Sequence, residues 1–98
     1  MVIEFSIYPL GTVHLAEPLA EMVKILDKHQ VKYTMGPMGT TVQGDWDKLM
    51  PLIKECHEFF AQDSDRIVTH ITIDDKKRGD DSLGGRVESI ESKVGHAV

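Results

Sequence analysis

The segment from Tyr33 to Gly44 gathers side chains that could hold a small, flat molecule. It reads YTMGPMGTTVQG, so turn residues, two hydroxyls, a flexible thioether and an aromatic ring fall close together. Glycine lets a ligand approach the backbone closely, and a threonine hydroxyl both donates and accepts hydrogen bonds. Tyr33 or the nearby Trp46 could stack on a heterocycle. The same residues also suit an ordinary β-hairpin, so a binding role is one of two interpretations at this point.

Metal binding is a second chemistry to consider, because imidazole is a common ligand. The chain has five histidines: His14, His29, His57, His70 and His96. None stands at an i, i+4 spacing from another histidine, and none belongs to a ligand signature typical of zinc. We therefore expect no native metal site.

The single cysteine, Cys56, is adjacent to His57 on a predicted helix. Neighbouring helical residues project about 100° apart, so these two cannot pair as nucleophile and base. Core packing is the favoured role of Cys56, since cysteine is so often buried. No serine-centred elbow, glycine-rich phosphate loop or paired-carboxylate motif is present. We expect a protein that is not an enzyme and carries no cofactor.

A short basic cluster, Lys76, Lys77 and Arg78, could hold an anion. Four aspartates at positions 74, 75, 80 and 81 flank it closely and cancel most of its field. Mixed exposed charges are also strongly screened by salt. A solvated loop is therefore the favoured role of this cluster.

The composition excludes several classes of protein. The 98 residues are 41% hydrophobic and 28% charged, which suits one globular domain spanning residues 1–98. A net charge of −5 disfavours binding to nucleic acid or anionic lipid. No export or membrane segment is visible, and one cysteine cannot form an internal disulfide. We expect a cytoplasmic protein with neither nucleic-acid nor membrane partners.

Apolar periodicity divides the chain into strands and helices. Alternating residues and turn signals predict strands at Val2–Tyr8, Val31–Met35, Thr40–Gln43 and Arg66–Asp74. A three-to-four spacing of apolar residues predicts helices that begin between Leu15 and Glu17 and end near His29, and that span Asp47–Ala61 and Ser82–Lys93. The second helix contains Pro51, and an interior proline costs on the order of 3 kcal/mol. We therefore place the N-cap at Asp47 rather than start the helix at Asp45.

The order β-α-β-β-α-β predicts an α+β, ferredoxin-like sandwich with a four-stranded antiparallel sheet, both main helices on one face, and a short extra C-terminal helix. The opposite face of the sheet would carry Glu4, Ser6, Tyr8, Val68, His70 and Thr72. A protein this small gains much by packing such a face on another subunit. We expect a homo-oligomer.

Four parts of the chain also carry a resemblance to a known family. They are Pro9-Leu10-Gly11-Thr12, Val31-Lys32-Tyr33, the Gly36–Gly44 hairpin, and Arg66-Ile67-Val68 leading to Ile73-Asp74-Asp75. In this order and spacing they resemble the small, single-domain thiamine-binding protein family. The resemblance covers nearly the whole chain.

The resemblance implies a ferredoxin-like subunit that forms dimers through its sheets, commonly a homotetramer built as a dimer of dimers. It also implies binding of thiamine or its hydroxymethylpyrimidine part as a ligand, without chemical change. Thr40, Thr41 and the glycine backbone would contact the pyrimidine edge, and an acidic protein suits the cationic thiazolium. By residue type, the expected ligand contacts are Glu4, Ser6, Tyr33, Gly36, Met38, Gly39, Thr40, Thr41 and Trp46.

Two other functions fit the same residues. The chain could be a structural or regulatory oligomer whose sheet face binds a partner and whose hairpin is only a turn. It could also be a small amino-acid-sensing domain of the ACT type, which shares the topology but usually comes attached to an enzyme. Neither of these would bind thiamine.

Overall fold

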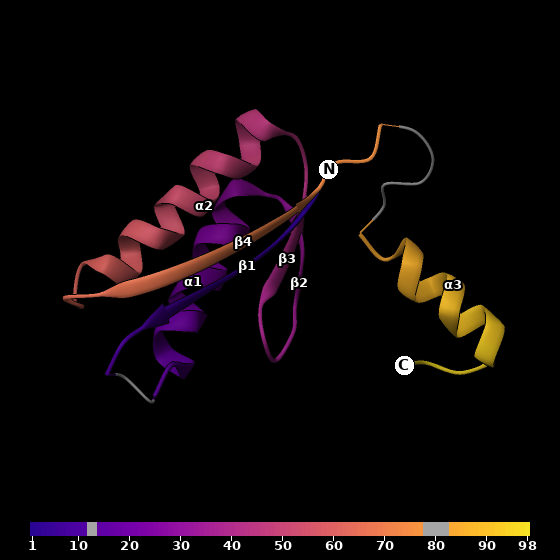
Figure 1. Cartoon of the computed structure of the whole chain (residues 1–98), viewed down its shortest axis with the longest axis horizontal. Helices are drawn as coiled ribbons and strands as arrows, with labels where there is room; N and C mark the ends of the chain where they lie inside the picture. The colour runs from indigo at the N-terminus through magenta and orange to yellow at the C-terminus, as the bar shows by residue number, and fades with distance from the viewer. Residues whose placement is uncertain (12–13, 78–82) are drawn as a thin grey trace.

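The structure, a computed structural model, describes residues 1–11, 14–77 and 83–98. Its elements in chain order are β1 (Val2–Pro9), α1 (Ala16–His29), β2 (Lys32–Met35), β3 (Thr40–Gln43), α2 (Trp46–Ala61), β4 (Ile67–Asp74) and α3 (Gly85–Val94). The strands form one antiparallel sheet in the order β2-β3-β1-β4, and α1 and α2 lie together on one side of it (Figure 1). The predicted ferredoxin-like α+β fold with an additional C-terminal helix is confirmed.

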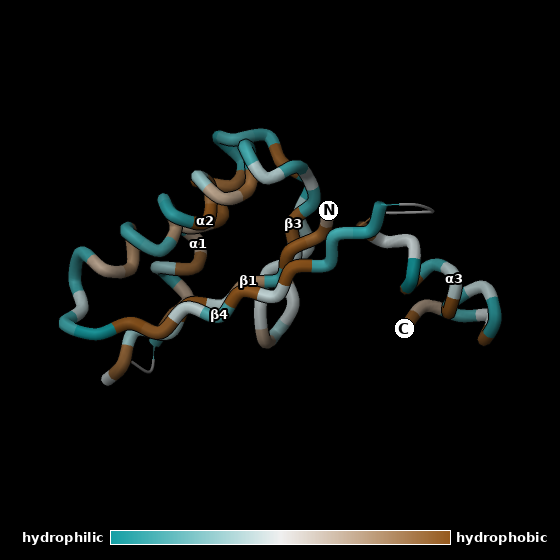
Figure 2. Tube along the Cα trace, turned by 45° about the horizontal axis from the view of Figure 1, so that its top comes forward, coloured by the Kyte–Doolittle hydropathy of each residue, from teal (hydrophilic) through white to brown (hydrophobic). Residues whose placement is uncertain are grey.

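The core lies between the sheet and the first two helices. Alternation along β1 directs Ile3, Phe5 and Ile7 toward the helices, and all three are buried. The largest fully buried side chains are Phe5, Ile3, Leu26, Leu49, Leu52, Val42 and Cys56. Figure 2 shows hydrophobic residues along β1 and hydrophilic residues on the outward side of α2. The predicted burial of Cys56 is confirmed.

The start of α2 differs from the prediction. The N-cap is Asp45 rather than Asp47, and its side chain accepts a hydrogen bond from the Lys48 N–H at 3.1 Å. Pro51 therefore lies inside the helix, where the carbonyl of Asp47 loses its usual partner. A capped helix end is worth about 0.5–2 kcal/mol, and four buried apolar side chains of α2 follow the proline. The prediction overweighted the cost of proline against these gains.

Other boundaries shift by a few residues. β1 continues through Pro9, and β2 and β4 each begin one residue later than predicted. α3 begins at Gly85, whereas the predicted start at Ser82 lies outside the described residues, as does Arg78 of the basic cluster. No helix in residues 1–11, 14–77 and 83–98 is long and apolar enough to cross a membrane.

The outer strand β4 is only partly covered by the helices. Ile71 and Ile73 lie opposite Phe5 and Ile3, which places them on the helix side of the sheet. They are nevertheless 41% and 38% exposed. α2 contacts β4 nearer its start, at Thr69, whose hydroxyl lies 2.6 Å from a histidine nitrogen of α2. The second half of β4 therefore leaves two isoleucines open on an edge strand.

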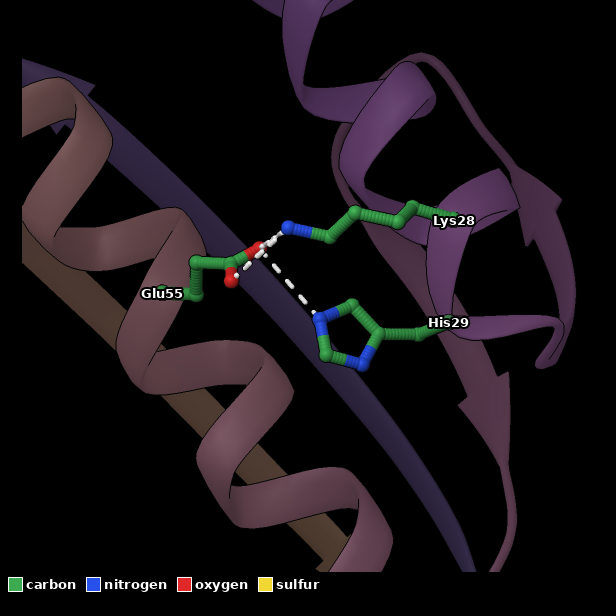
Figure 3. A network of polar contacts seen from close by, with 3 residues as sticks. All are labelled: Lys28, His29 and Glu55. Carbon is green, nitrogen blue, oxygen red and sulfur yellow. Dashed lines mark hydrogen bonds and ion pairs between the residues drawn. The ribbon is translucent and has the colours of Figure 1, made fainter.

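Polar contacts join α1 to α2 at the end of α1. Lys28 Nζ lies 3.1 Å from a carboxylate oxygen of Glu55, and His29 Nε2 lies 3.3 Å from the same carboxylate (Figure 3). The hydrogen bond from Lys28, and secondly that from His29, lowers the pKa of Glu55 from its usual value. The charged form of Glu55 is therefore favoured by folding.

We predict that Glu55→Gln lowers stability near neutral pH and that this loss shrinks in acid. A carboxyl group whose pKa is lowered on folding contributes stability above its ordinary value of 4.5, and that contribution disappears as the pH falls through the lower folded value. Urea midpoints of the wild type and variant across this range provide the measurement. Glu58→Gln on the same helix is the control, with a smaller effect. A Glu55→Gln loss of equal size in strong acid would contradict the assignment.

Candidate ligand-binding site

A small cavity lies between the tip of the β2–β3 hairpin and the first turns of α1. Its volume is about 130 Å³. β1 contributes residues 5–8, α1 and its N-cap contribute Leu15, Leu19 and Met22, and the hairpin contributes residues 35–40. The site is therefore built from three elements that are far apart in the sequence.

The cavity exists because the hairpin is shorter than the strand beside it. β1 pairs with β4 from Val2 to Pro9, but it pairs with β3 only from Val2 to Phe5. The chain then turns back, and the Gly36 N–H donates to the Gly39 carbonyl at 2.9 Å to close the turn. No described strand lies beside the second half of β1 on this side. The cavity occupies the place that a longer β3 would fill.

Gly39 lets the hairpin tip approach β1 this closely. A Cβ at this position would lie 3.2 Å from the Phe5 carbonyl oxygen and 3.4 Å from Cγ of Glu4. The distance to the carbonyl oxygen is tight for a real side chain, and this carbonyl belongs to the backbone of the central strand. A larger residue would therefore push the turn away from β1 and change the shape of the cavity.

The cavity wall is mainly apolar, with one buried polar side chain. Thr40 is 3% exposed, and its hydroxyl makes no hydrogen bond to any residue in the described part of the chain. Among those residues no fully buried side-chain nitrogen or oxygen lacks a partner, so the Thr40 oxygen must retain some contact with the cavity or solvent. Ser6 and Tyr8 add two further hydroxyls to the lining. An apolar pocket with a few hydroxyls suits a flat, weakly polar ring.

The mouth of the cavity carries exposed apolar side chains. Tyr8 is 37% exposed and Met38 is 78% exposed. The Tyr8 hydroxyl donates a long hydrogen bond, 3.5 Å, to the Met38 carbonyl, and its ring meets the His70 ring edge-on with centroids 6.0 Å apart. Tyr8 therefore connects the cavity to the open face of the sheet.

The structure brings five of the nine predicted contact residues to this cavity: Ser6, Gly36, Met38, Gly39 and Thr40. Tyr33 lies elsewhere on β2, where its hydroxyl donates to Asp27 at 2.9 Å, and this hydrogen bond raises the pKa of Tyr33. Trp46 begins α2, at the opposite end of the hairpin from the turn, and is 49% exposed. Neither of the two predicted stacking residues lines the cavity.

Thr41 and Glu4 also lie away from the cavity. They are register partners on β3 and β1, and they face the open side of the sheet. There they line a broad groove of about 780 Å³ whose other side is α3. Successive strand residues point to opposite faces, and of these two threonines only Thr40 lines the cavity.

The sequence analysis missed several residues of the cavity. The sequence predicts Tyr8 on the open face of the sheet and gives no ligand contact to Ile7. The three apolar residues from the start of α1 were assigned only to a helical stripe. The strand end Pro9-Leu10-Gly11 beside Tyr8 was a usable signal, because it marks where β1 leaves the sheet. The contribution of α1 had no local signal, since it depends on how the helix packs.

α3 lies apart from the body formed by the sheet, α1 and α2 (Figure 1). None of its residues is buried, and its apolar side chains Val87, Ile90 and Val94 are 45–51% exposed. Two polar contacts tie its start to the sheet: the Leu83 N–H donates to Gln43 Oε1 at 2.9 Å, and the Arg86 guanidinium lies 3.9 Å from the Asp74 carboxylate. In the described part of the chain, no other element buries the apolar side of α3.

The described residues provide little for catalysis. Burial raises the pKa of the Cys56 thiol to about 12, so the thiolate is not populated near neutral pH. No group of three or more histidine, cysteine or acidic side chains in the described ranges could hold a metal ion. The residues around the cavity include no histidine, carboxylate, lysine or cysteine.

The fold and cavity define a small ferredoxin-like domain with an apolar pocket beside a glycine-rich hairpin. The model of the thiamine-binding protein family matches residues 3–91, and the chain belongs to that family, as its resemblance predicted. A UPF0045 protein of Methanothermobacter thermautotrophicus is 38% identical over 95 residues, covering 93% of this chain and 96% of that protein. The UPF0045 protein YqgV of Bacillus subtilis is 30% identical over 98 residues, covering 93% and 94%. The family is one of binding or uncharacterised proteins rather than known enzymes.

Solved structures agree with the fold. A hypothetical protein of Methanocaldococcus jannaschii superposes with a TM-score of 0.82 at 29% identity, covering 91% of this chain and 93% of that one. A Thermotoga maritima protein described as a candidate thiamine biosynthesis or salvage protein superposes with a TM-score of 0.76 at 24% identity, covering 91% and 96%. At that identity the second similarity supports the fold alone.

We predict that Cys56 is unreactive in the folded protein. Its side chain is buried, and its raised pKa leaves almost no thiolate at mildly alkaline pH. Ellman's reagent should give no fast release of colour from native protein and one equivalent from protein unfolded in urea. Rapid reaction of the native protein would show that the core around α2 is open.

Proposed function

We propose that this protein binds thiamine or its hydroxymethylpyrimidine part without transforming it, and that the pyrimidine ring occupies the cavity at the hairpin tip. The observation that carries the proposal is the cavity itself: an apolar pocket with the buried hydroxyl of Thr40 on its wall. Membership of the thiamine-binding protein family supports the choice of ligand.

The size of the cavity favours one ring rather than two. Its volume is about 130 Å³, and an apolar cavity of about 150 Å³ in another protein holds benzene. The thiazolium ring of thiamine would therefore remain at the mouth, near Tyr8 and Met38. An aromatic ring is a favourable neighbour for a cation, and the net charge of −5 favours a cationic ligand at longer range.

The lining of the cavity favours binding without reaction. General acid–base catalysis needs a side chain that exchanges a proton near the working pH. Among the described residues that line the cavity, Tyr8 is the only one with a titratable side chain. A ligand in this pocket would meet apolar walls and the hydroxyls of Ser6, Tyr8 and Thr40, with no carboxylate, histidine or lysine among the described lining residues to remove a proton.

We also propose that the protein acts as a cytoplasmic homo-oligomer, a dimer of dimers joined through sheet faces. The open face of the sheet has no helix packed on it, and α3 exposes Val87, Ile90 and Val94 beside that face. A single apolar stripe on a ten-residue helix needs a docking surface to be stable in water. A second copy of the chain would supply that surface.

A structural or regulatory oligomer remains the second candidate function. The exposed apolar side of α3 favours it, because this feature is explained by assembly whether or not a ligand binds. Under this alternative the hairpin is only a turn, and loss of the Thr40 hydroxyl has no effect on any ligand.

We predict that Thr40→Val weakens thiamine binding by about three- to tenfold, because one neutral hydrogen bond is worth about 0.5–1.5 kcal/mol. Thr41→Val is the matched control, since it makes the same change at the next residue but on the opposite face of the sheet. Isothermal titration calorimetry with thiamine and with hydroxymethylpyrimidine measures both. Equal affinities for the two variants would contradict the cavity as the site, and no heat from the wild type would contradict thiamine binding.

A second prediction concerns assembly. Ile90→Glu should shift the protein toward smaller species, because it places a charge in the exposed apolar side of α3 that we assign to the interface. Ser92→Glu adds the same charge to the exposed opposite side of the helix and should leave the mass unchanged. Light scattering during gel filtration reports the number of 11.0 kDa subunits. A wild type that elutes as a monomer would refute the oligomer.

A further inference from the structure

The main-chain N–H and C=O groups of successive residues in β1 point alternately toward β3 and toward β4. The strand register identifies the residues whose main-chain groups point toward the hairpin. The Met1 amino group donates to the Gly44 carbonyl at 2.9 Å, and the Gly44 N–H donates to the Met1 carbonyl at 3.1 Å. Residues that exchange both bonds recur at every second position of an antiparallel pair. Ile3 opposite Val42 and Phe5 opposite Thr40 are therefore the next two such pairs.

The next residue in this series is Ile7. The hairpin turns back before it reaches the position opposite Ile7. The register between β1 and β3 ends at Phe5, so no described residue is paired with Ile7 on this side. On the other side of β1, the Leu10 N–H donates to the Arg66 carbonyl at 3.0 Å. The main-chain groups of the even-numbered residues of β1 therefore point toward β4. The N–H and C=O of Ile7 therefore point away from β4, toward the cavity that Ile7 lines.

These two groups form a donor and an acceptor in one plane. Ile7 is 6% exposed, so its main chain lies in a poorly hydrated place where an unpaired polar group is costly. Pro9, the following residue with the same direction, has no N–H, so Ile7 is the last residue of β1 that offers both groups. An exposed strand edge is a known template for main-chain hydrogen bonds to a ligand.

We propose that the main-chain N–H and C=O of Ile7 bind the edge of a heterocycle that carries an amino group next to a ring nitrogen. The Ile7 N–H would donate to the ring nitrogen, and the ligand amino group would donate to the Ile7 carbonyl. This inference rests on the proposed function, since the aminopyrimidine of thiamine has such an edge. The bound ligand would thus make the main-chain hydrogen bonds to β1 that β3 does not make at this position.

The arrangement predicts a specific pattern of selectivity. In the 4-oxo analogue of hydroxymethylpyrimidine the amino donor becomes a carbonyl acceptor, and the neighbouring ring nitrogen carries a hydrogen. The ring N–H would then face the Ile7 N–H, and the carbonyl of the analogue would face the Ile7 carbonyl. Buried polar groups that are left unpaired on binding weaken the complex, because they lose their bonds to water without gaining a partner. The 4-oxo analogue should bind at least about tenfold more weakly than the 4-amino compound.

Amide hydrogen exchange followed by NMR observes Ile7 directly in the unmodified protein. In the free protein the Ile7 amide should exchange at least about tenfold faster than the amides of Ile3 and Phe5, which are paired with β3. Saturating 4-amino-5-hydroxymethyl-2-methylpyrimidine should slow Ile7 exchange at least about tenfold while leaving Ile3 and Phe5 nearly unchanged. Calorimetry on the same samples gives the affinity of both pyrimidines.

The outcomes separate this inference from the proposed function. Binding of the 4-amino compound with slowed Ile7 exchange and a weaker 4-oxo analogue supports both. Binding of the 4-amino compound with unchanged Ile7 exchange overturns the role of Ile7 and leaves the proposed function standing. Slowed exchange with equal binding of the two pyrimidines also overturns it, because occupancy alone would explain the protection. No binding of either pyrimidine or of thiamine overturns both.

Discussion

The difference in length between β1 and the hairpin beside it is the constraint on which the rest of the site depends. β1 has eight residues and β3 has four, so half of the central strand loses its neighbour on one side. The core residues of the first half pack as in any sheet covered by helices. The second half leaves a gap, and leucine and methionine side chains from α1 and its N-cap cover this gap. A cavity at this place follows from the strand lengths and the tight turn.

Much of the fold could be predicted from the sequence, because local patterns determine it. A few neighbouring positions are enough to recognise the alternation in β1, the apolar stripes of the helices and the turn residues around Gly36 and Gly39. The start of α2 could not be read in this way. It depends on a balance between the cap at Asp45 and the cost of Pro51, and the balance is decided by the buried side chains that follow.

The site was only partly predictable, because composition does not say which face of a strand a residue occupies. Thr40 and Thr41 are chemically identical, yet the register with β1 buries one beside the cavity and turns the other to the open face. Tyr33 is of a suitable type for stacking on a ligand ring, but its hydroxyl donates a hydrogen bond to Asp27 near the end of α1. The contribution of a main-chain group, as at Ile7, leaves no trace in residue type. Such sites require the register of the sheet.

A crystal structure of the protein with hydroxymethylpyrimidine would locate the ligand and its hydrogen-bond partners. The account predicts one pyrimidine per subunit between the hairpin tip and α1, with its edge against the main chain of Ile7 and the Thr40 hydroxyl within hydrogen-bond distance. Density for the ring in the groove between α3 and the open face, beside Thr41 and Glu4, would contradict it. So would a ring bound at Trp46 with the cavity occupied only by water.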